Sequence, residues 1–108
     1  MKREYPAPAE IKREPTHPGA ILDHQVLPAL KLSIAEAALK LGVSRQTLYR
    51  IVKCKAAVTP DMAIRIGKLC GNGPNLWLSL QRSHDLWHAK RKLGTRINRI
   101  PTMKEAAV

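Results

Sequence analysis

The sequence predicts an all-α protein folded as a compact bundle of five helices, and three observations support this prediction. Phenylalanine is absent and aromatic residues make up only 4% of the 108 residues, so the core must be built from leucine, isoleucine, valine and alanine, which suits packed helices. Apolar residues recur at steps of three and four along several segments. Capping residues, prolines and glycines stand at the ends of these segments. With 44% hydrophobic residues, we expect one domain with a modest core.

The first expected helix begins at His17-Pro18-Gly19, because proline suits the first helical position, where its missing N–H has no partner to lose. It should end near Leu27, since Pro28 disfavours the helical conformation in the residue before it. Residues 1–16 contain three prolines among mixed charges. We expect them to form a flexible arm, which either contacts DNA or a partner protein or has no binding role.

Residues 33–52 predict a helix, a tight turn at Gly42 and a second helix. Glycine tolerates the left-handed backbone that such a turn requires, and Ser44 is a good N-cap for the second helix. The small side chain of Ala38 allows the two helices to approach closely. The inward faces carry small and apolar residues at helical spacing: Ala37, Ala38, Leu41, Leu48 and Ile51. Together these features are typical of a helix-turn-helix.

The outward face of the second helix carries hydrogen-bonding side chains, namely Arg45, Gln46, Thr47, Tyr49 and Arg50. Arginine can bind guanine with two hydrogen bonds, and glutamine can bind adenine in the same way. Residues near the N-terminus of such a helix contact base edges when it lies in the major groove, so Arg45 and Gln46 form the best reading pair. The alternative is an ordinary solvated face, because both residue types are good helix formers.

The charge of the chain favours a polyanionic partner. Nineteen Lys and Arg residues against eight Asp and Glu residues give a formal net charge of +11. Nucleic acid is favoured over a membrane surface, because no strongly apolar amphipathic stretch carries the charge. The sequence contains no apolar run of about 18 residues and no hydrophobic signal-peptide core near Met1, so we expect a cytoplasmic, nucleoid-associated protein without a membrane partner. Cys54 and Cys70 are expected to be structural thiols.

Two further helices are expected after the helix-turn-helix. Thr59-Pro60-Asp61 combines an N-cap, a proline and an early acid, which predicts a helix over residues 60–70. Gly73-Pro74 opens a last helix that should end near Arg91. Aromatic residues are enriched at interface centres, so one face of this helix is predicted to pack on a second copy of the protein. That face carries Trp77, Leu80, His84 and Trp87, and the alternative is that the tryptophans belong to the core.

The last stretch of the chain is basic. Six basic residues and no acid occur between Lys90 and Lys104. We expect an ordered domain over residues 17–91 and a disordered tail over residues 92–108, whose charges either contact phosphates or are simply solvated.

Five segments, which cover about residues 17–90 between them, resemble the HigA/VapI-type antitoxins of the Xre-like helix-turn-helix proteins. Four of them lie partly or wholly outside the helix-turn-helix and separate this family from the wider Xre-like repressors. The segments are His17-Pro18-Gly19, Leu41-Gly42-Val43-Ser44-Arg45-Gln46-Thr47, Thr59-Pro60-Asp61-Met62-Ala63, Trp77-Leu78-Ser79-Leu80-Gln81 and Asp85-Leu86-Trp87.

This resemblance implies a lambda-repressor-like DNA-binding fold and a bacterial, often plasmid-linked antitoxin. Such a protein forms a homodimer, binds a palindromic operator in double-stranded DNA to repress its own operon, and neutralises a RelE-like toxin that cleaves mRNA. The resemblance places base reading on Arg45, Gln46, Thr47 and Arg50, and backbone contacts on Ser44 and Tyr49. We also expect Lys53 and Lys55, in the basic loop that follows, to contact the DNA backbone.

Two positions depart from the family pattern. Ile34 stands where the family commonly has glutamine, which puts a phosphate contact there in doubt. The loop after the second helix is usually Asn-Gly-Lys, but here it is Lys53-Cys54-Lys55. A left-handed backbone is uncommon for cysteine, so a different loop path is expected.

Three other functions are alternatives to a DNA-binding antitoxin: a solitary repressor, a scaffold and a metal-dependent enzyme. A solitary repressor without a toxin partner would have the same sequence features. A scaffold that only holds another protein, or binds RNA, would lack operator preference, and the exposed aromatic platforms that stack unpaired bases are missing. His84 and His88 stand at i and i+4, as in H-E-x-x-H metal sites, but no glutamate follows His84 and no third ligand is indicated. We therefore expect no enzyme activity, no metal and no cofactor.

Overall fold

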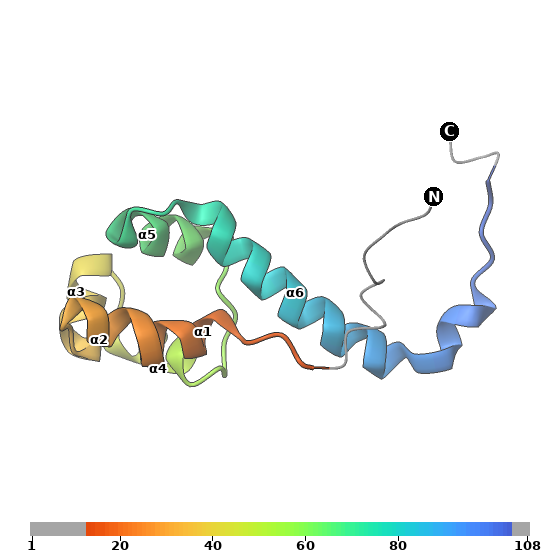
Figure 1. Ribbon diagram of the computed structural model, residues 1–108, viewed down its shortest axis with the longest axis horizontal. Helices are drawn as coiled ribbons and strands as arrows, with labels where there is room; N and C mark the ends of the chain where they lie inside the picture. Colours follow the sequence, from red (N-terminus) through yellow and green to blue (C-terminus); the bar gives the residue numbers. More distant parts are fainter. Residues whose placement is uncertain (1–12, 105–108) are drawn as a thin grey trace.

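The computed structural model describes residues 13–104, and every regular element between them is helical. The predicted all-α class is confirmed, and most of the predicted N-terminal arm lies outside the described residues. Counting α1, η2 and α2 as one continuous helix, the bundle has five helices, followed by a 3-10 segment (Figure 1). The elements are α1 (Pro18–Ile21), η2 (Leu22–Val26), α2 (Leu27–Leu30), α3 (Ile34–Leu41), α4 (Arg45–Val52), α5 (Pro60–Cys70), α6 (Pro74–Leu93) and η3 (Gly94–Arg99).

The first helix does not end before Pro28 as predicted. The segment η2 is π-helical, and the N–H of Leu27 donates to the carbonyl of Leu22, five residues earlier. This wider turn lets Pro28 enter the first turn of α2, where its missing N–H is not needed. The helix instead ends at Leu30 and is followed by Lys31, whose φ of 59° is left-handed.

The start of the first helix is capped by a histidine. His17 is buried, and its Nδ1 accepts a hydrogen bond from the Gly19 N–H at 2.8 Å. Burial lowers the pKa of His17, with a further contribution from nearby His84, and this favours the neutral ring that the cap needs. The second residue of α1, Gly19, lies directly against the backbone of α4, because a Cβ added there would be 1.7 Å from the Ile51 carbonyl oxygen.

The two helices of the predicted helix-turn-helix, α3 and α4, have well-formed ends. Ser33 and Glu36 form a capping box at the start of α3, and these hydrogen bonds lower the pKa of Glu36. Gly42 closes the turn with a left-handed φ of 76°, as predicted. All five predicted inward residues are buried: Ala37, Ala38, Leu41, Leu48 and Ile51.

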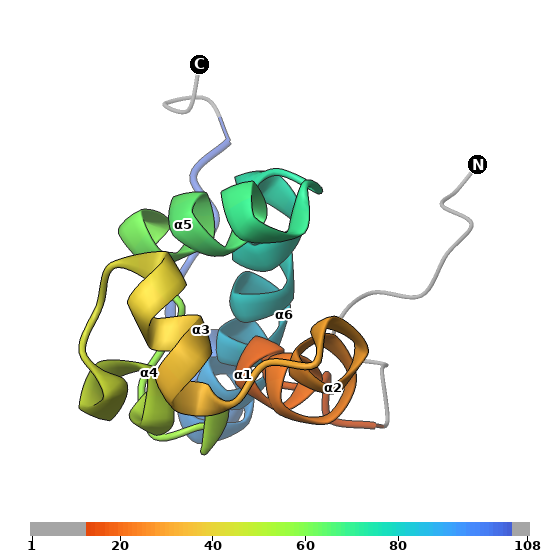
Figure 2. The same ribbon diagram turned by 90° about the vertical axis from the view of Figure 1, so that its left-hand side faces the viewer.

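The remaining helices complete the core. Thr59 caps α5 through a hydrogen bond from the Met62 N–H, and α5 packs along the first part of α6. Viewed end-on, the other helices gather around this part of α6, while its C-terminal half projects away from them (Figures 1 and 2). Between residues 13 and 104 no helix is long and apolar enough to cross a membrane.

The last helix is longer than predicted. It ends at Leu93 rather than near Arg91, and the 3-10 segment η3 follows it. The guanidinium of Arg96 donates to the carbonyls of Lys92 and Leu93 at the end of α6. Residues 92–99 are therefore helical and do not belong to the disordered tail that the sequence predicts.

Candidate nucleic-acid interface

The helix α4 presents the predicted reading residues to solvent. Arg45, Gln46, Thr47, Tyr49 and Arg50 are all exposed, whereas Leu48 and Ile51 of the same helix are buried. In Figure 2, α4 lies at the edge of the bundle beside α3. The buried residues fix the rotation of the helix, so its polar face must point outward.

The N-terminus of α4 is rigidly capped. The Thr47 N–H donates to Ser44 Oγ at 3.0 Å, and Ser44 Oγ lies 2.9 Å from Thr47 Oγ1. The Ser44 hydroxyl is thereby used within the cap, while the Thr47 hydroxyl keeps its own hydrogen for an outside acceptor. This cap holds the first turn, which carries Arg45 and Gln46, in one orientation.

A shallow depression separates the two helices of the motif on this face. It is lined by Ile34 and Ala35 from α3 and by Arg45, Gln46 and Tyr49 from α4. Ile34 is half-buried and packs against the core. The side chain at this position is therefore part of an apolar surface next to the reading pair and cannot make the polar phosphate contact of the family pattern.

The loop after α4 has the left-handed backbone that a glycine would adopt at position 54. The prediction that this loop takes a different path is therefore wrong. Cys54 adopts φ 61°, the left-handed conformation that was considered uncommon for this residue. The Cys54 N–H donates to the Ile51 carbonyl and the Lys55 N–H to the Arg50 carbonyl, which is the hydrogen-bond pattern of a Schellman motif. These bonds give two carbonyl groups at the end of α4 a donor and offset the conformational cost of the left-handed Cys54.

We expect Cys54→Gly to raise the free energy of unfolding by about 1 kcal/mol, because a side chain in the left-handed region costs roughly that amount. Chemical denaturation of the two proteins measures the difference. Cys54→Ala, which keeps a Cβ at φ 61°, is the matched control and should leave stability close to that of the parent. A loss of stability in Cys54→Gly would contradict this account of the loop.

Basic side chains continue from α4 into this loop. Lys53 Nζ lies 5.5 Å from the centre of the Tyr49 ring, and Lys55 is exposed. The guanidinium of Arg50 donates to the Lys55 carbonyl at 3.3 Å, so it rests against the loop rather than extending freely. The basic residues are therefore held at the C-terminal end of the same exposed face.

Arg65 has a structural role that its position on a predicted helix did not indicate. From α5, its Nη1 donates to the Leu41 carbonyl at 2.8 Å and lies 3.4 Å from the Gly42 carbonyl. Its Nε pairs with Asp61, one turn earlier on the same helix. The spacing of Asp61 and Arg65 was a visible signal for the ion pair, but nothing local indicated the contact with the turn.

We expect Arg65→Ala to lower the free energy of unfolding by about 2 kcal/mol, because it removes a charged donor from two carbonyls at the end of α3. Thermal denaturation monitored by circular dichroism would measure this loss. Asp61→Ala removes only the partly exposed ion pair and should cost less than about 1 kcal/mol. Equal losses in both variants would show that the turn contact contributes nothing.

Only part of the predicted dimer face is exposed and able to contact a second copy of the protein. Trp77 is 1% exposed within a single chain, and its Nε1 donates to Asn72 Oδ1, so it has no surface left to bury against a second copy. The prediction that Trp77 contributes to a dimer interface is therefore wrong, because its ring is buried in the core of the single chain. Leu80, His84 and Trp87 keep partial exposure, and their role in a dimer stays a prediction.

Comparison with known proteins agrees with this geometry. The family described as helix-turn-helix matches residues 26–77, which include α3, α4 and α5. An uncharacterized HTH-type transcriptional regulator of Haemophilus influenzae is 39% identical over 84 residues, which cover 75% of this chain and 78% of that protein. Virulence-associated protein I of Dichelobacter nodosus is 33% identical over 75 residues, which cover 69% of each chain.

Solved structures show the same arrangement. The Pseudomonas aeruginosa antitoxin HigA, determined with the higBA promoter, superimposes with a TM-score of 0.77 at 32% identity, covering 83% of this chain and 98% of that chain. The likeness therefore includes α5 and α6 as well as the helix-turn-helix. On these grounds, the chain belongs to the Xre-like helix-turn-helix family that includes the HigA antitoxins and virulence-associated protein I.

Proposed function

We propose that this antitoxin-like DNA-binding protein is a sequence-specific repressor of its own operon and that it neutralises a toxin encoded beside it. The main observation in favour of sequence-specific DNA binding is the capped N-terminus of α4, which bears Arg45 and Gln46. The buried residues of α4 fix the rotation of the helix, so these two side chains face outward. The HigA structure determined with its promoter supports this proposal by likeness.

In this proposal α4 enters the major groove of one half-site. Arg45, Gln46 and Thr47 reach base edges from the first turn, and Arg50 does so from the next. The apolar side chains of Ile34 and Ala35, which line the same depression as Arg45 and Gln46, suit the methyl group of a thymine. Phosphates on either side would be held by Tyr49 and by the loop lysines, Lys53 and Lys55, whereas the Ser44 hydroxyl is already used within the cap.

A dimer fits a palindromic operator, because two recognition helices would occupy half-sites about 34 Å apart, one helical turn of DNA. Leu80, His84 and Trp87 on α6 are the candidate contacts between the two copies. In size exclusion chromatography with light scattering, we expect twice the mass of one chain, and a single-chain mass would count against the dimer. The protein would act in the bacterial cytoplasm, on the nucleoid.

The DNA proposal is tested by binding to a labelled duplex from upstream of the protein's own gene. A shuffled duplex of equal length is the control, and both are measured at two salt concentrations, because non-specific phosphate binding falls steeply with salt. We expect a preference of about a thousandfold that survives the higher salt. Equal binding to both duplexes, lost at the higher salt, would mean that the +11 charge acts alone.

The toxin part has a separate test. We expect an open reading frame next to the gene whose product, a RelE-like mRNA-cleaving toxin, arrests growth when expressed alone. Co-expression of this protein should restore growth, and the two proteins should purify together. If operator binding holds but no neighbouring product arrests growth, the protein is a solitary repressor.

A further inference from the structure

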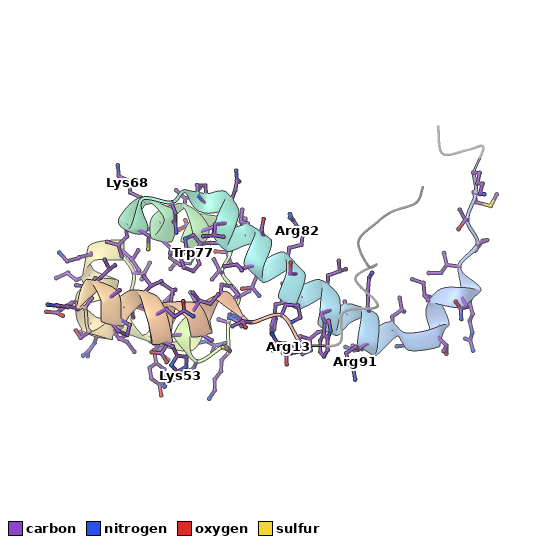
Figure 3. All side chains as sticks on the ribbon, in the orientation of Figure 1. Arg13, Lys53, Lys68, Trp77, Arg82 and Arg91 are labelled. Carbon is purple, nitrogen blue, oxygen red and sulfur yellow. The ribbon has the colours of Figure 1, made fainter. Side chains whose placement is uncertain are left out.

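Three potential metal ligands meet on the side of α6 that faces the segment leading into α1. Glu14 Oε2 lies 2.5 Å from His88 Nε2 and 3.2 Å from His84 Nε2. One ligand atom from each of the three side chains falls within 4.8 Å of the other two. In Figure 3 the segment that begins at Arg13 runs beside α6, which brings the carboxylate to the two rings.

The arrangement has a simple structural origin. His84 and His88 are four residues apart on α6 and therefore project from the same face of the helix. The sequence showed this pair but no third ligand, because Glu14 is 70 residues away from the nearer histidine. The packing of the first helix on α4 and α6 brings the segment that precedes it across this face.

We propose that Glu14, His84 and His88 bind a divalent transition metal ion of the Zn²⁺ type. Two imidazole nitrogens and one carboxylate oxygen are a common ligand set for Zn²⁺, with a fourth position left to water. Imidazole ligands favour zinc, copper and nickel over magnesium and calcium, which prefer sites made only of oxygen. The ligand atoms are close enough for one ion to replace the direct contacts between them.

The surroundings of His84 support a ligand role for this ring. Its Nε2 faces Glu14, and its Nδ1 is buried and, among the described residues, makes no hydrogen bond. The Asp85 carboxylate lies 3.5 Å from this Nδ1. A metal-bound histidine usually donates its other ring N–H to such a carboxylate, which orients the ring.

The carboxylate of Asp85 is itself held in place. It accepts a hydrogen bond from Gln81 Nε2 at 2.9 Å, and Gln81 Oε1 accepts one from the Val58 N–H at 2.7 Å. The nearby ring of His17 is not a fourth ligand through Nδ1, because that atom already accepts the cap bond from Gly19. The three ligands thus have an ordered outer shell on one side and solvent on the other.

A bound ion would fasten residue 14 to α6 and so stabilise the start of the first helix. Since the ligand set is absent from the unfolded chain, binding stabilises the folded state and raises the melting temperature as the metal concentration rises. The same link would slow tryptic cleavage after Arg13, because the protease must pull the adjoining Glu14 into its active site.

The test uses the full chain, freed of metal by a chelator and titrated with Zn²⁺ at neutral pH by calorimetry. We expect one ion per chain, a higher melting temperature and slower cleavage after Arg13. Co²⁺ should give the visible absorption of tetrahedral coordination. His88→Asn and Glu14→Gln change exposed side chains and should each weaken Zn²⁺ binding by about a hundredfold or more, beyond the effect typical of outer-shell changes.

Two control variants separate this site from other sources of metal binding. His24→Asn removes an exposed histidine on η2, and Cys54→Ser removes an exposed thiol, so neither should change the affinity. The proposal is overturned if Zn²⁺ does not bind stoichiometrically, or if it binds equally well to His88→Asn and Glu14→Gln. In the first case the cluster would be only an ion pair between the carboxylate and protonated imidazoles.

Discussion

Replacing Gly19 with alanine is expected to lower the free energy of unfolding by about 3 kcal/mol. A Cβ at this position would lie 1.7 Å from the carbonyl oxygen of Ile51 and 2.7 Å from its carbonyl carbon. Both are backbone atoms, so the whole of the first helix or of α4 must move to make room. Helix propensity alone predicts the opposite sign, a gain of about 1 kcal/mol for alanine.

Chemical denaturation at one temperature would measure this loss. Gly71→Ala is the matched control, because a Cβ there meets nothing within 4 Å and only the left-handed φ of 79° opposes it. We expect that variant to lose no more than about 1 kcal/mol. A Gly19→Ala protein as stable as the parent would show that the first helix does not rest on α4.

Replacing Arg45 or Gln46 with alanine is expected to cost about 1–3 kcal/mol in binding to the operator and to relax the preference for particular bases. Each side chain can make two hydrogen bonds to one base, and the buried residues of α4 hold both in the first turn. The measurement is competition between the operator and duplexes that are changed at single base pairs. Binding to the shuffled duplex should change far less than binding to the operator.

Three further variants serve as controls for charge. Lys53→Ala and Lys55→Ala should weaken binding to the operator and to the shuffled duplex alike. They should also reduce the salt dependence of binding, because a lysine that contacts DNA phosphates does not distinguish one base sequence from another. Arg82→Ala removes the same charge as Arg45→Ala from the exposed side of α6, away from α4, and should leave the preference intact (Figure 3). Equal losses on both duplexes for all the α4 and loop variants would contradict the reading role.

The positions of the helices were largely predictable from local signals. Ser33, Ser44 and Thr59 each cap a helix as their sequence context predicts, and Gly42 makes the left-handed turn. These signals act through hydrogen bonds and φ preferences within a few residues, so a single sequence contains them. The polar face of α4 was predictable for the same reason, because the inward spacing of Leu48 and Ile51 determines which residues remain outside.

Local rules failed where the surroundings offset a local cost. Pro28 was expected to stop the first helix, but the π-helical turn before it makes room for its ring. Cys54 was expected to avoid the left-handed conformation, but two hydrogen bonds at the end of α4 hold it there. The conformational cost of each residue is about 1–3 kcal/mol, and the hydrogen bonds or the wider turn around it can offset that cost.

The sequence by itself determined the all-helical class, the helix-turn-helix and the polar face that α4 presents, because each depends on neighbours within one or two turns. The tertiary structure alone decided which side chains from distant segments meet. It buried Trp77 in the core, brought Arg65 to the turn after α3 and placed Glu14 beside His84 and His88. The contacts of Arg65 and Glu14 join residues 24 to 74 positions apart, and their geometry depends on how whole helices pack, which no local pattern specifies.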